Sequence, residues 1–162
     1  MLQGLTSAGL GKLESDLQFI ELAAKHEFQC VDIDAKGLAD RLGVEAAADL
    51  LQSHHLEIGA IGLPVEWRGS DEQFLSGLEK LPAAAAAAKA LGCTRCCTYI
   101  LPATDASAAH FMALATTRLR ACASILGAYG IRLALEFVGP HHLRTQLEEP
   151  VHLDRPRDSG LG

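Results

Sequence analysis

The segment LGCTRCCTYILPATDASAAHFMALATTRLRACASILGAYGIRLALEF, residues 91–137, decides the fold because it predicts a strand, a helix and a second strand in that order. Short apolar runs at 96–100 and 131–137 predict the two strands. Gly130 ends the helix with a left-handed cap. A strand that alternates with a long amphipathic helix is typical of a parallel sheet covered by helices. The helix has its apolar residues on one side, at Phe111, Leu114, Leu119, Cys122, Ile125 and Leu126.

The same alternation extends back to the N-terminus. Further strands are expected at 2–6, 30–34 and 57–63, and a helix at about 44–54 follows a short turn at 36–41. Two capping boxes, SDLQ (15–18) and SDEQ (70–73), each open a helix. The second of these runs to about residue 91, and Pro82 either kinks it or restarts it. The total is about five parallel strands and four helices.

Two architectures fit this order of elements, an open doubly wound sheet and a (β/α)₈ barrel. The sequence has no GxGxxG after its first strand and no GxxxxGK[ST] phosphate loop, so the usual nucleotide-binding reasons for an open sheet are missing. Polar residues gather instead where the strands end, which is where barrel enzymes build their sites. We therefore predict an α/β fold, a partial (β/α)₈ TIM barrel. The strand-end residues are Asp34, Trp67, Tyr99 and Glu136.

Composition argues against several classes of protein. Hydrophobic residues make up 49% of the 162 residues and charged residues 21%, which is typical of a globular chain. The net charge of −6 disfavours nucleic-acid binding, and no apolar run is long enough for a membrane span. The first residues lack the features of a signal peptide, so we expect a cytoplasmic protein without membrane or nucleic-acid partners. Of five cysteines, we expect Cys30, Cys96 and Cys97 to be small buried hydrophobes in strands.

The last fifteen residues differ in character from the rest. Residues 148–162, EEPVHLDRPRDSGLG, contain two prolines and two glycines and have no periodic apolar face, so we expect a disordered tail after a domain at 1–147. A full barrel takes about 250 residues, so we expect a truncated barrel with roughly three strands missing. Unpaired edges at its first and fifth strands predict self-association.

Four runs carry a resemblance to a known family. DIDAKGLADRLG (32–43), IGAIGLPVEWRGSDEQF (58–74), LGCTRCCTYILP (91–102) and YGIRLALEFVGP (129–140) together resemble the xylose isomerase-like TIM-barrel family of sugar phosphate isomerases and epimerases. The resemblance covers residues 1 to about 147 and implies a sugar or sugar phosphate as substrate. It also implies a divalent metal (Mn²⁺, Mg²⁺, Co²⁺ or Zn²⁺) held by Glu, Asp, His and Glu from strands five to eight. Glu136 matches the first of these ligands, and the other three have no counterpart here.

Glu136 is the candidate for both metal binding and catalysis. Strand alternation sends it to the face opposite Leu135 and Phe137, and burial of a carboxylate is costly unless it is paired or binds metal. Isomerising a ketose requires removal of a proton next to a carbonyl, for which a carboxylate is a suitable base. A metal bound to the substrate oxygens would stabilise the resulting enediolate. The alternative is a structural glutamate capped by a Lys or Arg.

Other residues are candidates for substrate binding. Trp67 could form an aromatic wall against a sugar, with Arg68 reaching a phosphate or carboxylate, or the loop that carries both could simply pack on the barrel rim. Asp34 and Tyr99 end strands and are expected at the site, whereas Asp32 is expected to be structural. The remaining polar candidates are the loop histidines His141 and His142, which we expect to be exposed.

Three functions remain open. The leading hypothesis is a metal-dependent sugar or sugar-phosphate isomerase or epimerase, incomplete as an isolated chain. The second is a non-catalytic fragment, or a subunit that completes its barrel with a partner. The third is a relative of abasic-site endonucleases, which requires several strand-end histidines and a basic surface that this sequence lacks.

Overall fold

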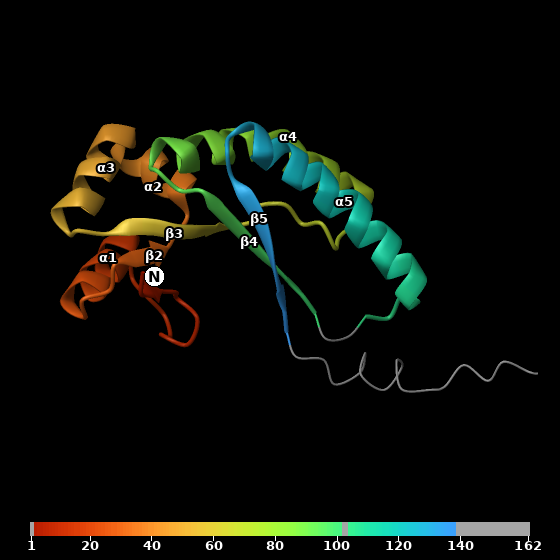
Figure 1. Cartoon of the computed structure of the whole chain (residues 1–162), viewed down its shortest axis with the longest axis horizontal. Helices are drawn as coiled ribbons and strands as arrows, with labels where there is room; N and C mark the ends of the chain where they lie inside the picture. The colour runs from red at the N-terminus through yellow and green to blue at the C-terminus, as the bar shows by residue number, and fades with distance from the viewer. Residues whose placement is uncertain (1, 102–103, 139–162) are drawn as a thin grey trace, which may run out of the picture.

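The computed structural model describes residues 2–101 and 104–138 and has an α/β fold with one five-stranded sheet (Figure 1). All strand pairs are parallel and the strands lie in sequence order, which confirms the predicted topology. The predicted tail at 148–162, its boundary at 147 and both loop histidines lie outside the described residues. The strands are β1 (Gly4–Leu5), β2 (Cys30–Asp32), β3 (Glu57–Gly62), β4 (Arg95–Ile100) and β5 (Arg132–Phe137).

Five helices, rather than the four predicted, are present in the described part of the chain. They are α1 (Asp16–Lys25), α2 (Ala35–Leu42), α3 (Val44–Ser53), α4 (Asp71–Ala90) and α5 (Ala108–Ala128). The additional helix is α2, which replaces the turn expected at 36–41. Asp34 begins it, because the Asp34 carboxylate accepts a hydrogen bond from Gly37 N at 3.0 Å. As a result β2 ends at Asp32 and not at residue 34.

The two predicted capping boxes differ in the structure. At α4 the box is complete: the Ser70 hydroxyl accepts from Gln73 N, and the Gln73 side chain accepts from Ser70 N. At α1 the Ser15 hydroxyl accepts from Gln18 N, but the Gln18 side chain accepts from Glu14 N instead. Helix α4 continues through Pro82 without a break, so the proline does not start a second helix.

The hydrophobic core lies between the sheet and the helices. From the sheet, Ile61 and Cys96 are in register and both are buried, and Leu133 of β5 pairs with Cys96. Helices α4 and α5 run side by side and close this core over the C-terminal strands (Figure 1). From the helices, the core includes Ile20, Leu38, Leu51, Leu81, Leu119 and Leu126.

No helix in the described ranges is long and apolar enough to cross a membrane.

The opposite face of the sheet, here called the inner face, is polar and exposed. Cys97 pairs with Ala134 and Tyr99 with Glu136, and side chains of paired residues project to the same side. This corrects the prediction for Cys97, which is exposed on the inner face, whereas Cys30 and Cys96 are buried as predicted. The reason is the period of two in a strand, which sends the adjacent Cys96 and Cys97 to opposite faces.

Candidate active site

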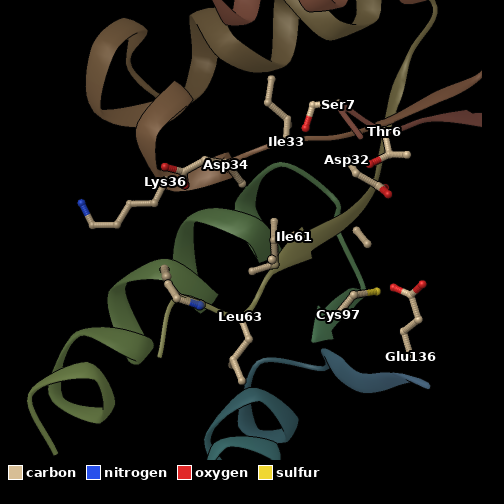
Figure 2. Close-up of a pocket in the computed structure, with 15 residues that line it drawn as sticks. Thr6, Ser7, Asp32, Ile33, Asp34, Lys36, Ile61, Leu63, Cys97 and Glu136 are labelled. Carbon is tan, nitrogen blue, oxygen red and sulfur yellow. The ribbon is translucent and has the colours of Figure 1, made fainter. Parts of the chain in front are cut away.

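A cavity of about 530 Å³ opens on the inner face, at the C-terminal ends of the strands. Its lining brings together residues that are far apart in the sequence, from β2, β4 and β5 and from the loop after β1. Figure 2 shows the carboxylates of Asp32 and Glu136 and the thiol of Cys97 directed toward one open space. The polar lining residues are Thr6, Ser7, Asp32, Asp34, Lys36, Cys97 and Glu136.

Glu136 occupies the position predicted from strand alternation. It lines the cavity, whereas the side chains of its neighbours Leu135 and Phe137 belong to the other face of β5 and are exposed there. Within the described residues no Lys or Arg forms an ion pair with Glu136. The alternative of a glutamate capped by a basic residue therefore finds no support in the geometry.

Asp32 is the carboxylate that sequence reasoning assigned to a structural role, and the structure places it in the cavity. Burial raises the pKa of Asp32, and a hydrogen bond from the Ala60 backbone opposes that shift. The sheet has a bulge between Val31 and Asp32, and Gly59 lies opposite it. A Cβ atom on Gly59 would lie only 2.8 Å from the Asp32 carboxylate, so glycine makes room for Asp32 at this point.

Asp34 also lines the cavity, but its carboxylate is engaged as the cap of α2. Asp34 thus lies at the cavity as predicted and also caps a helix, and Asp32, expected to be structural, lines the same cavity. The strand stops at Asp32, so the alternation predicted to extend to Asp34 does not apply there.

The Cys97 thiol lies in the field of both carboxylates. Burial raises its pKa first, and the negative charges of Asp32 and Glu136 raise it further, with a smaller opposing effect from Arg95. A thiolate is therefore disfavoured in this cavity at neutral pH, and Cys97 is unsuited to act as a nucleophile. The same charges favour a cation or a proton donor.

The loop between β3 and α4 forms one rim of the site and carries Trp67 and Arg68. Trp67 is fully buried, its indole N–H donates to the Thr98 hydroxyl at 3.1 Å, and its ring lies 6.0 Å from that of Phe111. The structure therefore favours the packing alternative for Trp67, because a side chain with no exposed area offers no face to a sugar.

Arg68 and Tyr99 are close together at the same rim. The Arg68 guanidinium stacks between the Trp67 and Tyr99 rings, 4.4 Å from each centroid, and it donates a hydrogen bond to the Tyr99 carbonyl. Both residues line a second cavity of about 400 Å³ next to Cys97, and Tyr99 is 47% exposed. Arg68 is thus held in place by contacts of its own, its Nε is buried without a hydrogen-bond partner, and its side chain is 22% exposed.

Sequence reasoning missed Arg118, which holds this rim in position. Its side chain is only 6% exposed and comes from α5. It donates to the carbonyls of Trp67 at 2.8 Å and Gly69 at 2.7 Å, and it pairs with Asp71 at 2.5 Å. The only signal in the sequence was a basic residue on the apolar side of a predicted helix.

Comparison with solved structures identifies the fold. A xylose isomerase domain protein from Alicyclobacillus acidocaldarius subsp. acidocaldarius superposes with a TM-score of 0.77 and 29% identity, over 89% of this chain and 52% of that one. The described residues therefore have a partial TIM-barrel fold, here called the half-barrel, which corresponds to the N-terminal half of that protein. A scan against models of known protein families found no match, and a comparison with curated proteins found none either.

Two further structures resemble the half-barrel. The IolI protein with a bound zinc atom has a TM-score of 0.69 and 22% identity, over 86% of this chain and 52% of its own. A D-psicose 3-epimerase from Clostridium cellulolyticum H10, solved with D-tagatose, has a TM-score of 0.66 and 13% identity, over 83% and 52%. The chain thus spans about half the length of each of these proteins.

The half-barrel alone does not fit a divalent metal. Among residues 2–101 and 104–138, no group of three or more His, Cys, Asp or Glu side chains is close enough to hold an ion. Asp32, Cys97 and Glu136 surround the same space without converging on a point. Because Mn²⁺ and Mg²⁺ require several oxygen ligands to replace bound water, this donor set is insufficient without further residues.

Proposed function

We propose that the half-barrel is part of a sugar isomerase or epimerase that moves a proton next to the carbonyl of a ketose. The observation that carries this proposal is the pair of carboxylates, Asp32 and Glu136, that face one cavity at the C-terminal ends of barrel strands. In TIM barrels this end of the sheet holds the active site. The structures similar to the half-barrel include an epimerase solved with a ketose, which supports the choice of substrate class.

The two carboxylates suit complementary steps of such a reaction. Glu136 lies at the strand end and is proposed as the base that removes the proton. A carboxyl with a raised pKa retains its proton more readily, so Asp32 is proposed to hold or return a proton on the other side of the cavity. Arg68 and Tyr99, at the neighbouring cavity, remain candidate contacts for the distal part of the sugar or its phosphate.

We further propose that Glu136 contributes one ligand to a divalent metal whose other ligands belong to the second half of the barrel. The isolated half-barrel should then bind Mn²⁺ weakly or not at all, because the described residues supply too few converging donors. The second half of the barrel would thus supply both the missing strands and the missing metal ligands.

Complementation tests this proposal. The C-terminal half of the Alicyclobacillus acidocaldarius protein, which this chain does not match, can be coexpressed or fused to the half-barrel. Calorimetric titration with Mn²⁺ should show binding only in the complemented form, and Glu136→Gln should lose both binding and ketose epimerisation. Glu79→Gln, an exposed change on α4, is the matched control and should lose neither. Full metal affinity in complemented Glu136→Gln would show that Glu136 is an ordinary strand residue.

A further inference from the structure

Strand β5 has a pattern of side chains that is symmetric about its centre. The stretch Ile131 to Phe137 reads IRLALEF, and Ala134 stands in the middle. The residues at equal distances on either side of Ala134 are Leu133 and Leu135, then Arg132 and Glu136, and then Ile131 and Phe137. Each pair is either apolar with apolar or a positive with a negative charge. A strand of this kind is complementary to a second copy of itself that runs in the opposite direction.

The structure leaves this strand available at an edge. Strand β5 is the last strand of the sheet, with a neighbour only on the β4 side among the described residues (Figure 1). Most of its side chains are exposed, and Phe137 is 74% exposed. A largely apolar strand of six residues that is paired on one side only, among the described residues, is a template for a further strand.

The main-chain hydrogen bonds have the phase that such pairing needs. Arg132 N donates to Thr94 O at 3.0 Å, and Val138 N donates to Ile100 O at 3.3 Å, so the even-numbered residues of β5 direct their main-chain groups at β4. The N–H and C=O groups of residues 133, 135 and 137 therefore point to the open edge. Antiparallel pairing centred on Ala134 matches 133 with 135 and 131 with 137, which are the pairs that would exchange these bonds.

In this register the side chains are matched as well. Arg132 of one copy lies opposite Glu136 of the other in a pair without mutual hydrogen bonds, where side chains are closest, and the symmetry repeats the contact. Leu133 lies opposite Leu135 on the other face. The small Ala134 meets its own copy on the two-fold axis and allows close approach.

We propose that this chain forms a two-fold symmetric dimer in which the β5 strands of two copies pair antiparallel and join the two sheets. The interface is isologous, as expected for a dimer of identical chains. It uses the edge at which further barrel strands would add and occupies Glu136, so dimerisation and barrel completion exclude each other. The dimer therefore does not depend on the proposed enzymatic function.

Charge reversal tests the register through the mass of the chain in solution, measured by light scattering and sedimentation from about 5 to 200 µM. The 162-residue chain should be a dimer at the upper concentrations. Arg132→Glu and Glu136→Arg each place like charges opposite one another twice, and should weaken the dimer on the order of tenfold or more. The double variant Arg132→Glu with Glu136→Arg restores opposite charges and should restore the dimer. Arg120→Glu, an exposed change on α5, is the control and should leave the dimer intact.

A cysteine at the two-fold axis gives a second readout that does not depend on affinity. Residue 134 lies opposite itself, with Cα atoms within the range that a disulfide spans. Ala134→Cys in a Cys97→Ser background, which removes the thiol beside it, should form a covalent dimer on oxidation. Ala113→Cys, exposed on α5, should not. A monomer at all concentrations, equal crosslinking at both positions, or a double variant that stays as weak as the single ones would overturn the proposal.

Discussion

At the scale of single residues, one buried arginine determines the geometry of a loop. Arg118 donates to two carbonyls of the β3–α4 loop and pairs with Asp71, and its guanidinium lies 4.9 Å from the centre of the Phe74 ring. The loop in turn holds Arg68 at the rim of the cavity. A side chain remote from the carboxylates thus positions part of the site.

Replacement of Arg118 should therefore be costly. Arg118→Met keeps much of the side-chain volume but leaves the carbonyls of Trp67 and Gly69 without their donor, so we expect a loss of about 2–4 kcal/mol in unfolding free energy. Arg120→Met, two residues away and exposed, should change stability by less than about 0.5 kcal/mol. Urea denaturation of the two variants makes the comparison. Equal effects would mean that the loop does not depend on Arg118.

The cysteines give a second prediction at this scale. Burial raises the pKa of Cys96 to about 12, with smaller contributions from neighbouring thiols, so almost none of it is thiolate at neutral pH. Cys97 is the one exposed cysteine of the five. A thiol reagent at pH 8 should therefore modify one cysteine in the folded protein, more slowly than a free thiol because the pKa of Cys97 is raised, and the others only on unfolding. Cys97→Ser should remove the reaction of the folded protein, whereas Cys122→Ser should leave it unchanged.

At the scale of elements, local capping sets where α4 begins. The complete capping box of Ser70 and Gln73 satisfies two main-chain donors at the start of a 20-residue helix. The same helix tolerates Pro82 in its interior, at a position where a main-chain hydrogen bond is lost. The helix is thus maintained by its cap and by packing rather than by its own propensity.

Removal of the Ser70 hydroxyl should lower the free energy of unfolding, whereas removal of a neighbouring serine hydroxyl should not. Ser70→Ala removes the acceptor for Gln73 N and should cost about 1 kcal/mol. Ser76→Ala, exposed within the same helix, replaces a weaker helix former with a stronger one and should be neutral or slightly stabilising. Thermal denaturation followed by circular dichroism measures both. A Ser70→Ala variant as stable as the parent would contradict the role of the cap.

At the scale of the whole molecule, the described residues combine a packed core with exposed apolar side chains at one edge of the sheet. The core between sheet and helices is continuous, whereas large apolar side chains at the β5 end, such as Leu135 and Phe137, remain exposed. Exposed apolar groups of this kind mark surfaces that contact other chains or segments. Within the described residues, the molecule therefore has a packed core together with an exposed edge at β5.

Alanine replacements of two phenylalanines test the packed core and the exposed edge separately. Phe19 is 3% exposed in the core, so Phe19→Ala should cost about 3–5 kcal/mol. Phe137→Ala should cost less than about 0.5 kcal/mol in the monomer, because it removes few packed contacts, but it should reduce the binding of an apolar fluorescent dye. Dye fluorescence and urea denaturation on both variants test the contrast. A large loss of stability in Phe137→Ala would show that its side chain is buried in solution.

The sequence by itself determined the order of the strands, their parallel arrangement, the cap of α4 and the direction of Glu136. These features follow from interactions within a few residues and from the periods of strands and helices, which are visible in one dimension. The same local rule, applied one step too far, extended β2 to Asp34, where the competing helix cap of α2 prevails.

Only the tertiary structure decided which side chains meet. Asp32, Cys97 and Glu136 come from three strands, and their common cavity depends on the register between strands and on a bulge opposite Gly59. Trp67 is buried rather than exposed because Thr98, Phe111 and the loop fixed by Arg118 enclose it. Contacts between residues 30 to 100 positions apart depend on the packing of whole elements, which no local pattern in the sequence specifies.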